Sequence, residues 1–247
     1  MKSTRRTSVI VFSCIFLLAF TANAGQILNN GGFESGNLTG WVTADSAASY
    51  GSFYADNQLY TPLNDNATVG PQAGSWYAVS DAYAPGTHAL TQTFTDPLGT
   101  TSALLSFSIF VNDLFGGGGT GGEVLLFANG ANPLSATPIA TLWGPTDTAE
   151  SSLNVPNAWV TVTNMNITAD LTAGTTYELS FLESDSTGPI NVGVDSVSLV
   201  TSSGSSTPEP SMLIPTALLA AFFAYRARGF KRQSGGASSV NSFGGNR

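Results

Sequence analysis

The stretch that decides the fold is TYELSFLES, residues 176–184, which alternates large apolar side chains with polar ones. Tyr177, Leu179 and Phe181 fall on one side of an extended chain, while Glu178 and Ser180 fall on the other. A period of two residues is typical of an antiparallel strand with one buried face. This stretch therefore predicts a sheet-forming chain.

Similar segments recur along the chain, separated by turns rich in Gly, Pro, Asn and Asp, and no long segment has the 3.6-residue period of a helix. We expect roughly nine or ten strands in a single domain over residues 25–200. The fold class that this pattern predicts is all-β, an antiparallel β-sandwich of jelly-roll type. Besides 176–184, the clearest strands are expected at 40–45, 75–81, 88–94, 102–111, 122–128, 158–168 and 191–200.

The last of these segments, NVGVDSVSLV (191–200), does not alternate in one register. Strict alternation would place Val192 and Val194 on one face and Val197 and Leu199 on the other, together with Asp195. We therefore expect either a kink or bulge near Asp195 or an inward-facing Asp195 with a specific partner.

The N-terminal residues 1–24 have the three parts of a secretory signal helix. Lys2, Arg5 and Arg6 precede an apolar run at 9–20, and small residues lead to a predicted cleavage before Gly25. The apolar run is shorter than the roughly 20 residues that a spanning helix needs. The single cysteine lies within this segment, so the mature protein is expected to contain no thiol and no disulfide.

The charge distribution limits the classes of partner. Residues 25–225 contain no Lys or Arg, yet they hold all 16 Asp and Glu residues of the chain. Such a surface cannot neutralise phosphates, so nucleic acid is not expected as a partner. It also lacks the cations that clamp anionic substrates. Its carboxylates are expected to be solvated, to accept backbone N–H groups or to bind metal cations.

A polar linker is expected at 201–207, followed by TPEPSMLIPTALLAAFFAYRARGFKR at 207–232. This segment resembles the PEP-CTERM sorting signal of exported bacterial proteins, which consists of Pro-Glu-Pro, an apolar helix and a basic cluster. The resemblance implies transient anchoring in the inner membrane, cleavage by an exosortase-type processing enzyme, and release to the cell surface or extracellular matrix. The residues that carry it are Pro208, Glu209, Pro210, Arg226, Arg228, Lys231 and Arg232.

This chain departs from the sorting-signal pattern in one respect. Such proteins commonly stop soon after the basic cluster, whereas this sequence continues through 233–247, which we expect to be a disordered tail. A permanent single-pass anchor at 208–232 is therefore the alternative.

Both ends of the expected domain also resemble a known type of module. ILNNGGFESGNLTGW (27–41) and VGVDSVSLV (192–200) are similar to the first and last parts of carbohydrate-binding-module-like, galactose-binding-like jelly rolls. The resemblance implies extracellular polysaccharide as a partner and a structural Ca²⁺ ion held by Glu34 and Asp195. The alternative is that Glu34 caps a turn and Asp195 accepts backbone amides.

Aromatic rings that face solvent could contact the flat faces of sugars. Tyr54, Tyr60 and Trp143 fall in loose segments rich in Asn, Pro and Gly, so they are our candidates for ligand binding.

We expect the protein not to be an enzyme. His88 is the only histidine, has no nucleophile-elbow pattern around it, and is interpreted as an ordinary surface residue. The spacings of Glu183 with Asp185 and of Asp81 with Asp96 leave glycoside hydrolysis open as a less favoured reading.

The leading hypothesis is thus an exported, non-enzymatic surface or matrix protein that associates with polysaccharide. The alternative is a purely structural acidic matrix protein that divalent cations bridge to other polymers.

Overall fold

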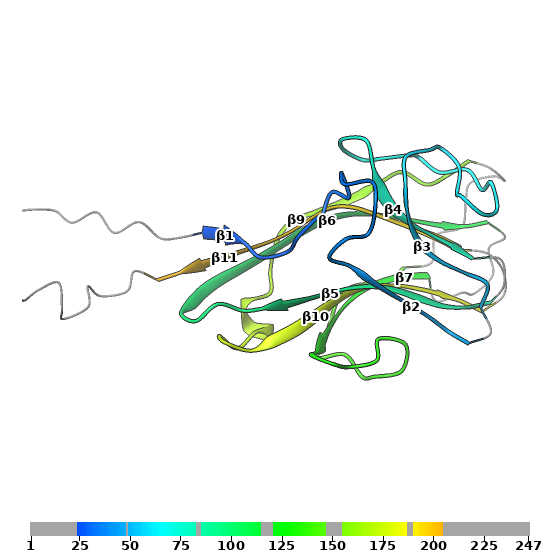
Figure 1. Ribbon diagram of the computed structural model, residues 1–247. Helices are drawn as coiled ribbons and strands as arrows, with labels where there is room; N and C mark the ends of the chain where they lie inside the picture. Colours follow the sequence, from blue (N-terminus) through cyan, green and yellow to red (C-terminus); the bar gives the residue numbers. More distant parts are fainter. Residues whose placement is uncertain are drawn as a thin grey trace, which may run out of the picture. The chain divides into compact units, whose positions relative to one another are not determined.

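The computed structural model describes residues 24–47, 49–82, 85–114, 121–146, 155–186 and 190–204. Within these residues it contains eleven strands and one short 3-10 helix, η1 (Thr168–Asp170). The strands form two antiparallel sheets that lie face to face as the two layers of a sandwich (Figure 1). The prediction of an all-β antiparallel sandwich is confirmed.

The first sheet, called sheet A, has the order β3-β4-β11-β6-β9, with β1 paired to the later part of β11. Its strands are β1 (Ala24–Gln26), β3 (Gly51–Asp56), β4 (Tyr77–Ala82), β6 (Thr100–Asp113), β9 (Val160–Asn166) and β11 (Ile190–Ser203).

The second sheet, called sheet B, has the order β2-β5-β10-β7-β8. Its strands are β2 (Val42–Asp45), β5 (Gly86–Thr95), β7 (Gly121–Ala128), β8 (Ala140–Thr146) and β10 (Thr176–Asp185). Consecutive strands lie in opposite sheets except for the pairs β3–β4 and β7–β8, and the eight strands from β4 to β11 follow the orders β4-β11-β6-β9 and β5-β10-β7-β8. This arrangement of two Greek keys is that of a jelly roll, as the sequence predicted.

Each of the eight strands expected from the sequence is found, with bounds that differ by a few residues. Strands β1, β3 and β8 were not among them. Strand β8 contains Gly144 and Pro145, which weaken the strand signal in the sequence, and proline is tolerated there because β8 lies at the edge of sheet B. At its end β11 continues past Val200 to Ser203, which pairs with Thr100, so 201–203 belong to the sheet and not to a linker.

The core lies between the two sheets and confirms the alternation read from β10. Tyr177, Leu179 and Phe181 are buried in the central apolar cluster, where Phe181 contacts Trp41 and Phe107 at ring-centre distances of 5.9 and 5.7 Å. Burying side chains of this size contributes about 1.5–3 kcal/mol each. The opposite face of β10 is also partly covered, because Ser180 and Leu182 are buried as well.

The predicted irregularity in β11 is a bulge. The pairing of β11 with β6 shifts between Asp195 and Ser198, and Ser196 has a φ of 54°. This extra residue lets Val194 and Val197 both enter the central cluster, although strict alternation would place them on opposite faces.

Several sequence predictions lie outside the described residues. These are the signal helix up to residue 23, the end of the linker, the sorting signal at 208–232 with its three-residue motif and basic cluster, and the tail at 233–247. Among the residues that the structure does describe, none forms a helix of the length and apolar character needed to cross a membrane.

Candidate functional site

The outer face of sheet B carries a second apolar cluster, separate from the central core. Ala89, Leu125, Phe127 and Leu182 are buried there, and half-buried alanine and leucine side chains pack against them. Ala89 lies on β5, Leu125 and Phe127 on β7 and Leu182 on β10, so the cluster spans three neighbouring strands. An outer sheet face of this kind must be covered by another part of the chain.

That cover is the connection between β7 and β8, residues 129–139, which we call the covering loop. Ala131, Leu134 and Ala136 of this loop contact the outer cluster. Asn132 accepts hydrogen bonds from the amides of Ser135 and Ala136, at 3.1 and 2.8 Å, so the loop has a defined turn.

A carboxylate of the sheet fixes the start of the covering loop. The backbone N–H of Gly130 donates to Oε1 of Glu178 on β10 at 2.7 Å. Hydrogen bonds that involve a charged acceptor are shorter and stronger than neutral ones. The loop is thus attached to the sheet both by apolar contacts and by a charge-assisted hydrogen bond.

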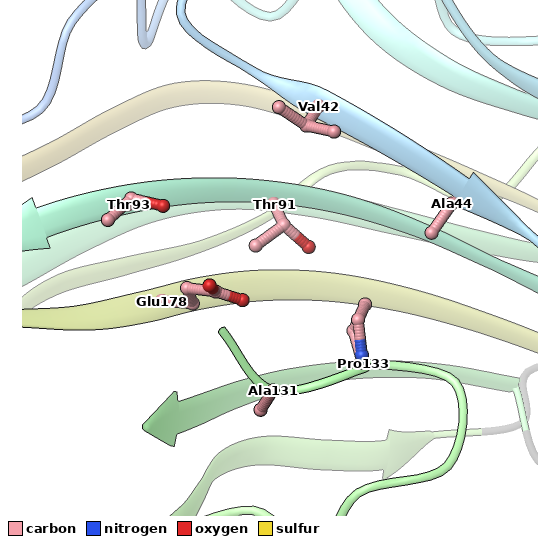
Figure 2. Close-up of a pocket in the computed structure, with 7 residues that line it drawn as sticks. All are labelled: Val42, Ala44, Thr91, Thr93, Ala131, Pro133 and Glu178. Carbon is pink, nitrogen blue, oxygen red and sulfur yellow. The ribbon is translucent and has the colours of Figure 1, made fainter. Parts of the chain in front are cut away.

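Two hollows lie beside the covering loop, and Pro133 lines both of them. The first has a volume of about 190 Å³, and its walls come from β2, β5, β10 and the loop, as Figure 2 shows. It is lined by Val42, Ala44, Thr91, Thr93, Ala131, Pro133 and Glu178. The second has a volume of about 380 Å³ and is lined by Glu123, Leu125, Phe127, Pro133, Leu134, Ser135, Ala136, Pro138, Thr141 and Leu182.

We call these two hollows together the outer groove. The first hollow combines apolar walls, from Val42 and Pro133, with the hydroxyls of Thr91 and Thr93 and the carboxylate of Glu178. Val42 is 68% exposed, which is unusual for a valine in a strand. Apolar surface with a few hydroxyl and carboxylate groups suits a polyhydroxylated ligand, which offers both C–H faces and hydrogen-bond donors.

The charge of the groove is negative. Glu178 lines the first hollow and Glu123 the second, and burial raises the pKa of Glu123 above its ordinary value. The sequence provides no Lys or Arg anywhere in 24–204 to balance these groups. A ligand of this groove is therefore neutral or cationic, because a polyanion would be repelled.

The three aromatic candidates from the sequence lie on separate elements, and none lines the outer groove. Tyr54 is half-buried on β3, where burial and then the charges of Asp81 and Asp45 raise its pKa. Tyr60 is 56% exposed in the loop after β3, and it is the one ring of the three that faces solvent freely. Trp143 on β8 is half-buried and packs edge-on against Phe107, at a ring-centre distance of 6.4 Å.

Glu34 and Asp195, the predicted Ca²⁺ ligands, both accept hydrogen bonds from the loop at residues 72–76. Asp195 Oδ2 accepts the amides of Gln72 and Ala73 at 2.9 and 3.0 Å. Glu34 Oε1 accepts the amides of Ser75 and Trp76 at 2.9 and 3.0 Å. We call this segment the capped loop.

The donor set of this site can be compared with what calcium needs. Ca²⁺ takes six to eight oxygen ligands. The described residues contain no group of three or more His, Cys, Asp or Glu side chains arranged for a metal ion. Backbone amides of the capped loop donate to both carboxylates, which is the arrangement expected if these residues hold the loop without a metal ion. Calcium at this site stays a prediction.

Gly74 shows how closely the capped loop approaches Glu34. It has a φ of 66°, and a β-carbon at this position would lie 2.3 Å from Glu34 Oε1. Only glycine combines this left-handed backbone with so close an approach. The sequence around residue 74 is thus matched to the carboxylate of Glu34.

The expectation that His88 is a surface residue is wrong. Its side chain is fully buried on the inner face of sheet B, with Nδ1 2.7 Å from Oδ1 of Asp45. The sequence pattern was misleading because β5 also turns a second polar residue, Gln92, toward the interior, where it bonds the backbone of Asn29 at 2.6 and 2.9 Å. Hydrophobic alternation cannot identify polar side chains that point inward.

The carboxylate pairs considered for hydrolysis are also buried. Asp81 accepts the amides of Leu63 and Asn64 at 2.5 and 3.2 Å, and Asp96 is only 2% exposed. Glu183 and Asp185 lie on β10, at 0% and 7% exposure. None of these four carboxylates lines the outer groove.

The outer groove itself was missed by sequence reasoning. One signal could have indicated it, because the segment GEVLLFA (122–128) is apolar on both faces and is followed directly by the polar turn residues NGANP (129–133). A strand that is apolar on both faces needs a cover on its outer side.

No protein-family model matches the sequence, and no curated protein matches it. Among solved structures, a β-1,4-galactotriose complex of a family-61 carbohydrate-binding module matches with a TM-score of 0.41 and 12% identity, over 71% of this chain and 97% of that one. The K3 cleaved adhesin domain of Lys-gingipain from Porphyromonas gingivalis matches with a TM-score of 0.47 and 18% identity, over 73% and 100%. An apo-form cyclase from Fischerella sp. matches with a TM-score of 0.46 and 16% identity, over 74% and 98%. These neighbours have different activities, so the likeness does not select a function for this chain.

Proposed function

We propose that this chain is an exported, non-enzymatic protein of the cell surface or extracellular matrix that associates with extracellular polysaccharide. The observation that carries the binding part is the outer groove, in which the exposed Val42 and the half-buried Pro133 stand beside two threonine hydroxyls and a carboxylate. A groove that is open to solvent can admit one stretch of a long chain without enclosing its ends.

The export part of the proposal rests on the sequence. The signal-like residues 1–24 and the Pro208-Glu209-Pro210 segment support secretion, transient anchoring in the inner membrane and cleavage by an exosortase-type enzyme. Intact-mass measurement on protein from the envelope and from the medium tests this directly. Recovery of a chain that retains both ends would contradict it.

The binding part is tested by measuring the affinity of the full chain for a panel of neutral polysaccharides. Val42→Asp places a charge in the groove, and we expect it to weaken binding at least about ten-fold, which corresponds to about 1.4 kcal/mol. Val160→Asp is the matched control, because Val160 is the first residue of β9 as Val42 is of β2, and it is also exposed, at 49%. Equal losses in both variants, or no binding to any polysaccharide, would contradict the proposal.

A second candidate function is supported by the charge distribution. All Asp and Glu residues except Glu209 lie in 24–204, which has no Lys or Arg, so divalent cations could bridge this domain to other acidic polymers. This candidate predicts association that requires Ca²⁺ or Mg²⁺ and is unaffected by Val42→Asp.

A further inference from the structure

One part of the outer face of sheet A carries no charged side chain. On β6 and β11, Ala103, Leu105 and Leu199 belong to the central core cluster, so the alternate residues of both strands point away from sheet B. These outward side chains are all half-buried, and they belong to Ser102, Leu104, Ser106, Ser198, Val200 and Ser202.

Strand pairing extends this surface to β9 and β1. Asn166 of β9 is paired with Leu104, and Gln26 of β1 is paired with Val200. Because Leu104 is paired with Val200, the four residues form one row across four strands, and serine pairs of β6 and β11 flank this row on both sides. We call this surface the neutral face. It has an apolar centre inside a rim of hydroxyls and amides, which is the usual anatomy of a protein interface.

The neutral face is open among the residues that the structure describes. Figure 1 shows the covering loop on sheet B and the loops after β3 on the β3–β4 side of sheet A, whereas no described segment lies over the part that holds β1 and the end of β11. The capped loop reaches β11 only at Asp195, on the other side of the bulge. The neutral face therefore has no cover from the described part of its own chain.

Charge distinguishes the neutral face from the rest of the domain. All 16 Asp and Glu residues except Glu209 lie in 24–204, where the sequence has no Lys or Arg. Two copies of this domain therefore repel each other wherever their carboxylates would meet. Contact through the outer groove, for example, would bring Glu178 and Glu123 of both copies together. The neutral face lets two copies touch without such a juxtaposition.

The chemistry of the neutral face also suits contact with itself. Serine hydroxyls and the amides of Asn166 and Gln26 each contain a donor and an acceptor, so a copy rotated by a two-fold axis presents matching groups. The face has no cation that would attract a polyanion. A neutral polysaccharide would not require the absence of carboxylates, whereas a second acidic domain does.

We propose that the neutral face is the surface through which two copies of this chain associate, as a symmetric dimer in which the two A sheets stack. Antiparallel sheets pack in this way at a spacing of about 10 Å. Four strands about 4.8 Å apart and five to six residues of about 3.3 Å give roughly 350 Å² per copy. Stable complexes bury about 800 Å² per partner, so this dimer is weak and reversible and forms at high local protein concentration.

Stacking of the A sheets leaves both outer grooves free. The neutral face lies on the outer side of sheet A and the outer groove on the outer side of sheet B, so the two grooves of a dimer face in opposite directions. A dimer can then hold two polysaccharide chains at once and link them. This consequence rests on the proposed function, whereas the stacking does not depend on what the groove binds.

Sedimentation equilibrium of the full chain tests the dimer, with mild detergent around the apolar end segments and a chelator to remove divalent cations. Val200→Asp places a carboxylate at the centre of each stacked face, and we expect the dissociation constant of the dimer to rise at least about ten-fold. Raising the ionic strength from about 0.01 to 0.15 M should strengthen the wild-type dimer, because salt screens the repulsion between the two acidic domains.

Val160→Asp is the matched control, because it adds the same charge to the same sheet. Val160 is paired with Ile109 of the core cluster, so it lies on the opposite face and its substitution should leave the dimer unchanged. Equal losses in the two variants, or a loss in Val160→Asp alone, would overturn the proposal.

Two further measurements keep the test decisive. If Val200→Asp does not fold, Ser202→Asp at the rim of the neutral face should raise the dissociation constant about three-fold or more, and an unchanged value would overturn the proposal. A wild type that stays monomeric at all concentrations up to about 1 mM would overturn it as well. An intact dimer that binds no polysaccharide would refute only the proposed function.

Discussion

Glu34 and Asp195, which lie near opposite ends of the domain sequence, accept hydrogen bonds from successive parts of one loop. Asp195 takes the amides of Gln72 and Ala73, and Glu34 takes those of Ser75 and Trp76. Asp195 stands at the start of the bulge in β11, next to Val194, whose side chain lies in the core. The first and last segments of the domain are thus joined through the capped loop.

Substitution Asp195→Asn is expected to destabilise the domain. The amide group of asparagine cannot replace a carboxylate that accepts from Gln72, Ala73 and Ser196, so at least one buried N–H loses its acceptor. We expect the free energy of unfolding to fall by about 1–3 kcal/mol. Urea denaturation measures this, with Asp65→Asn as the control because Asp65 is exposed. Equal stability of the two variants would show that the capped loop contributes little.

A Ca²⁺ ion at Glu34 and Asp195 predicts a separate effect. Removal of the ion by a chelator should lower the melting temperature, because a ligand that binds only the folded state stabilises it. Glu34→Gln should then abolish the difference between calcium and chelator. A melting temperature that is the same under both conditions would leave the amide hydrogen bonds as the whole role of these carboxylates.

The stability of the domain is expected to fall as the pH rises. Burial raises the pKa of Glu183 in the folded state, so between the ordinary glutamate pKa and the raised value the folded state binds more protons than the unfolded state. Stability from such a group is full below the unfolded pKa and is lost as the pH rises through the folded one. Glu183→Gln cannot ionise, so its urea midpoint should depend less on pH. A parallel pH dependence in both proteins would contradict this assignment.

Much of the fold could be predicted from local patterns, and the exceptions have physical causes. Alternation in 176–184 and its failure near Asp195 predicted the buried face of β10 and the bulge in β11, because both features depend on side-chain period alone. The burial of His88 could not be predicted, since its hydrogen-bond partner Asp45 lies on β2, far from β5 in the sequence. The outer groove likewise forms only when β2, β5 and β10 meet the covering loop.

The hydrogen bond from Gly130 to Glu178 is expected to control the order of the covering loop. Glu178→Ala removes the acceptor at 2.7 Å, while the apolar contacts of Ala131 and Leu134 remain. We expect hydrogen exchange of the amides at 129–136 to accelerate about five-fold or more, equivalent to about 1 kcal/mol of local stability. Thr93→Ala serves as the control, because Thr93 faces Glu178 across the strand pair. Similar exchange rates in the two variants would argue that apolar contacts alone hold the loop.

Gly193 on β11 is expected to be required for packing on the outer face of sheet A. It is paired with Phe110, whose ring lies over it and also packs against Trp159 at a ring-centre distance of 4.7 Å. A β-carbon at residue 193 would lie 2.0 Å from Cε1 of Phe110, so Gly193→Ala must displace the ring and disturb the Trp159 contact. Overpacking of this kind costs about 1–3 kcal/mol of unfolding free energy.

The matched control for Gly193→Ala is Gly25→Ala, because a β-carbon at Gly25 on β1 would meet no atom within 4 Å. Denaturation followed by tryptophan fluorescence measures both variants, and the signal of Trp159 should change in Gly193→Ala even before unfolding. A second substitution, Phe110→Leu, removes the ring atoms that the new β-carbon meets and should therefore recover part of the loss. The recovery should be only partial, because the Phe110 ring also contacts Tyr77, at 6.2 Å between ring centres. If Gly193→Ala is as stable as Gly25→Ala, the ring of Phe110 moves without cost and the contacts of Phe110 with Tyr77 and Trp159 do not constrain β11.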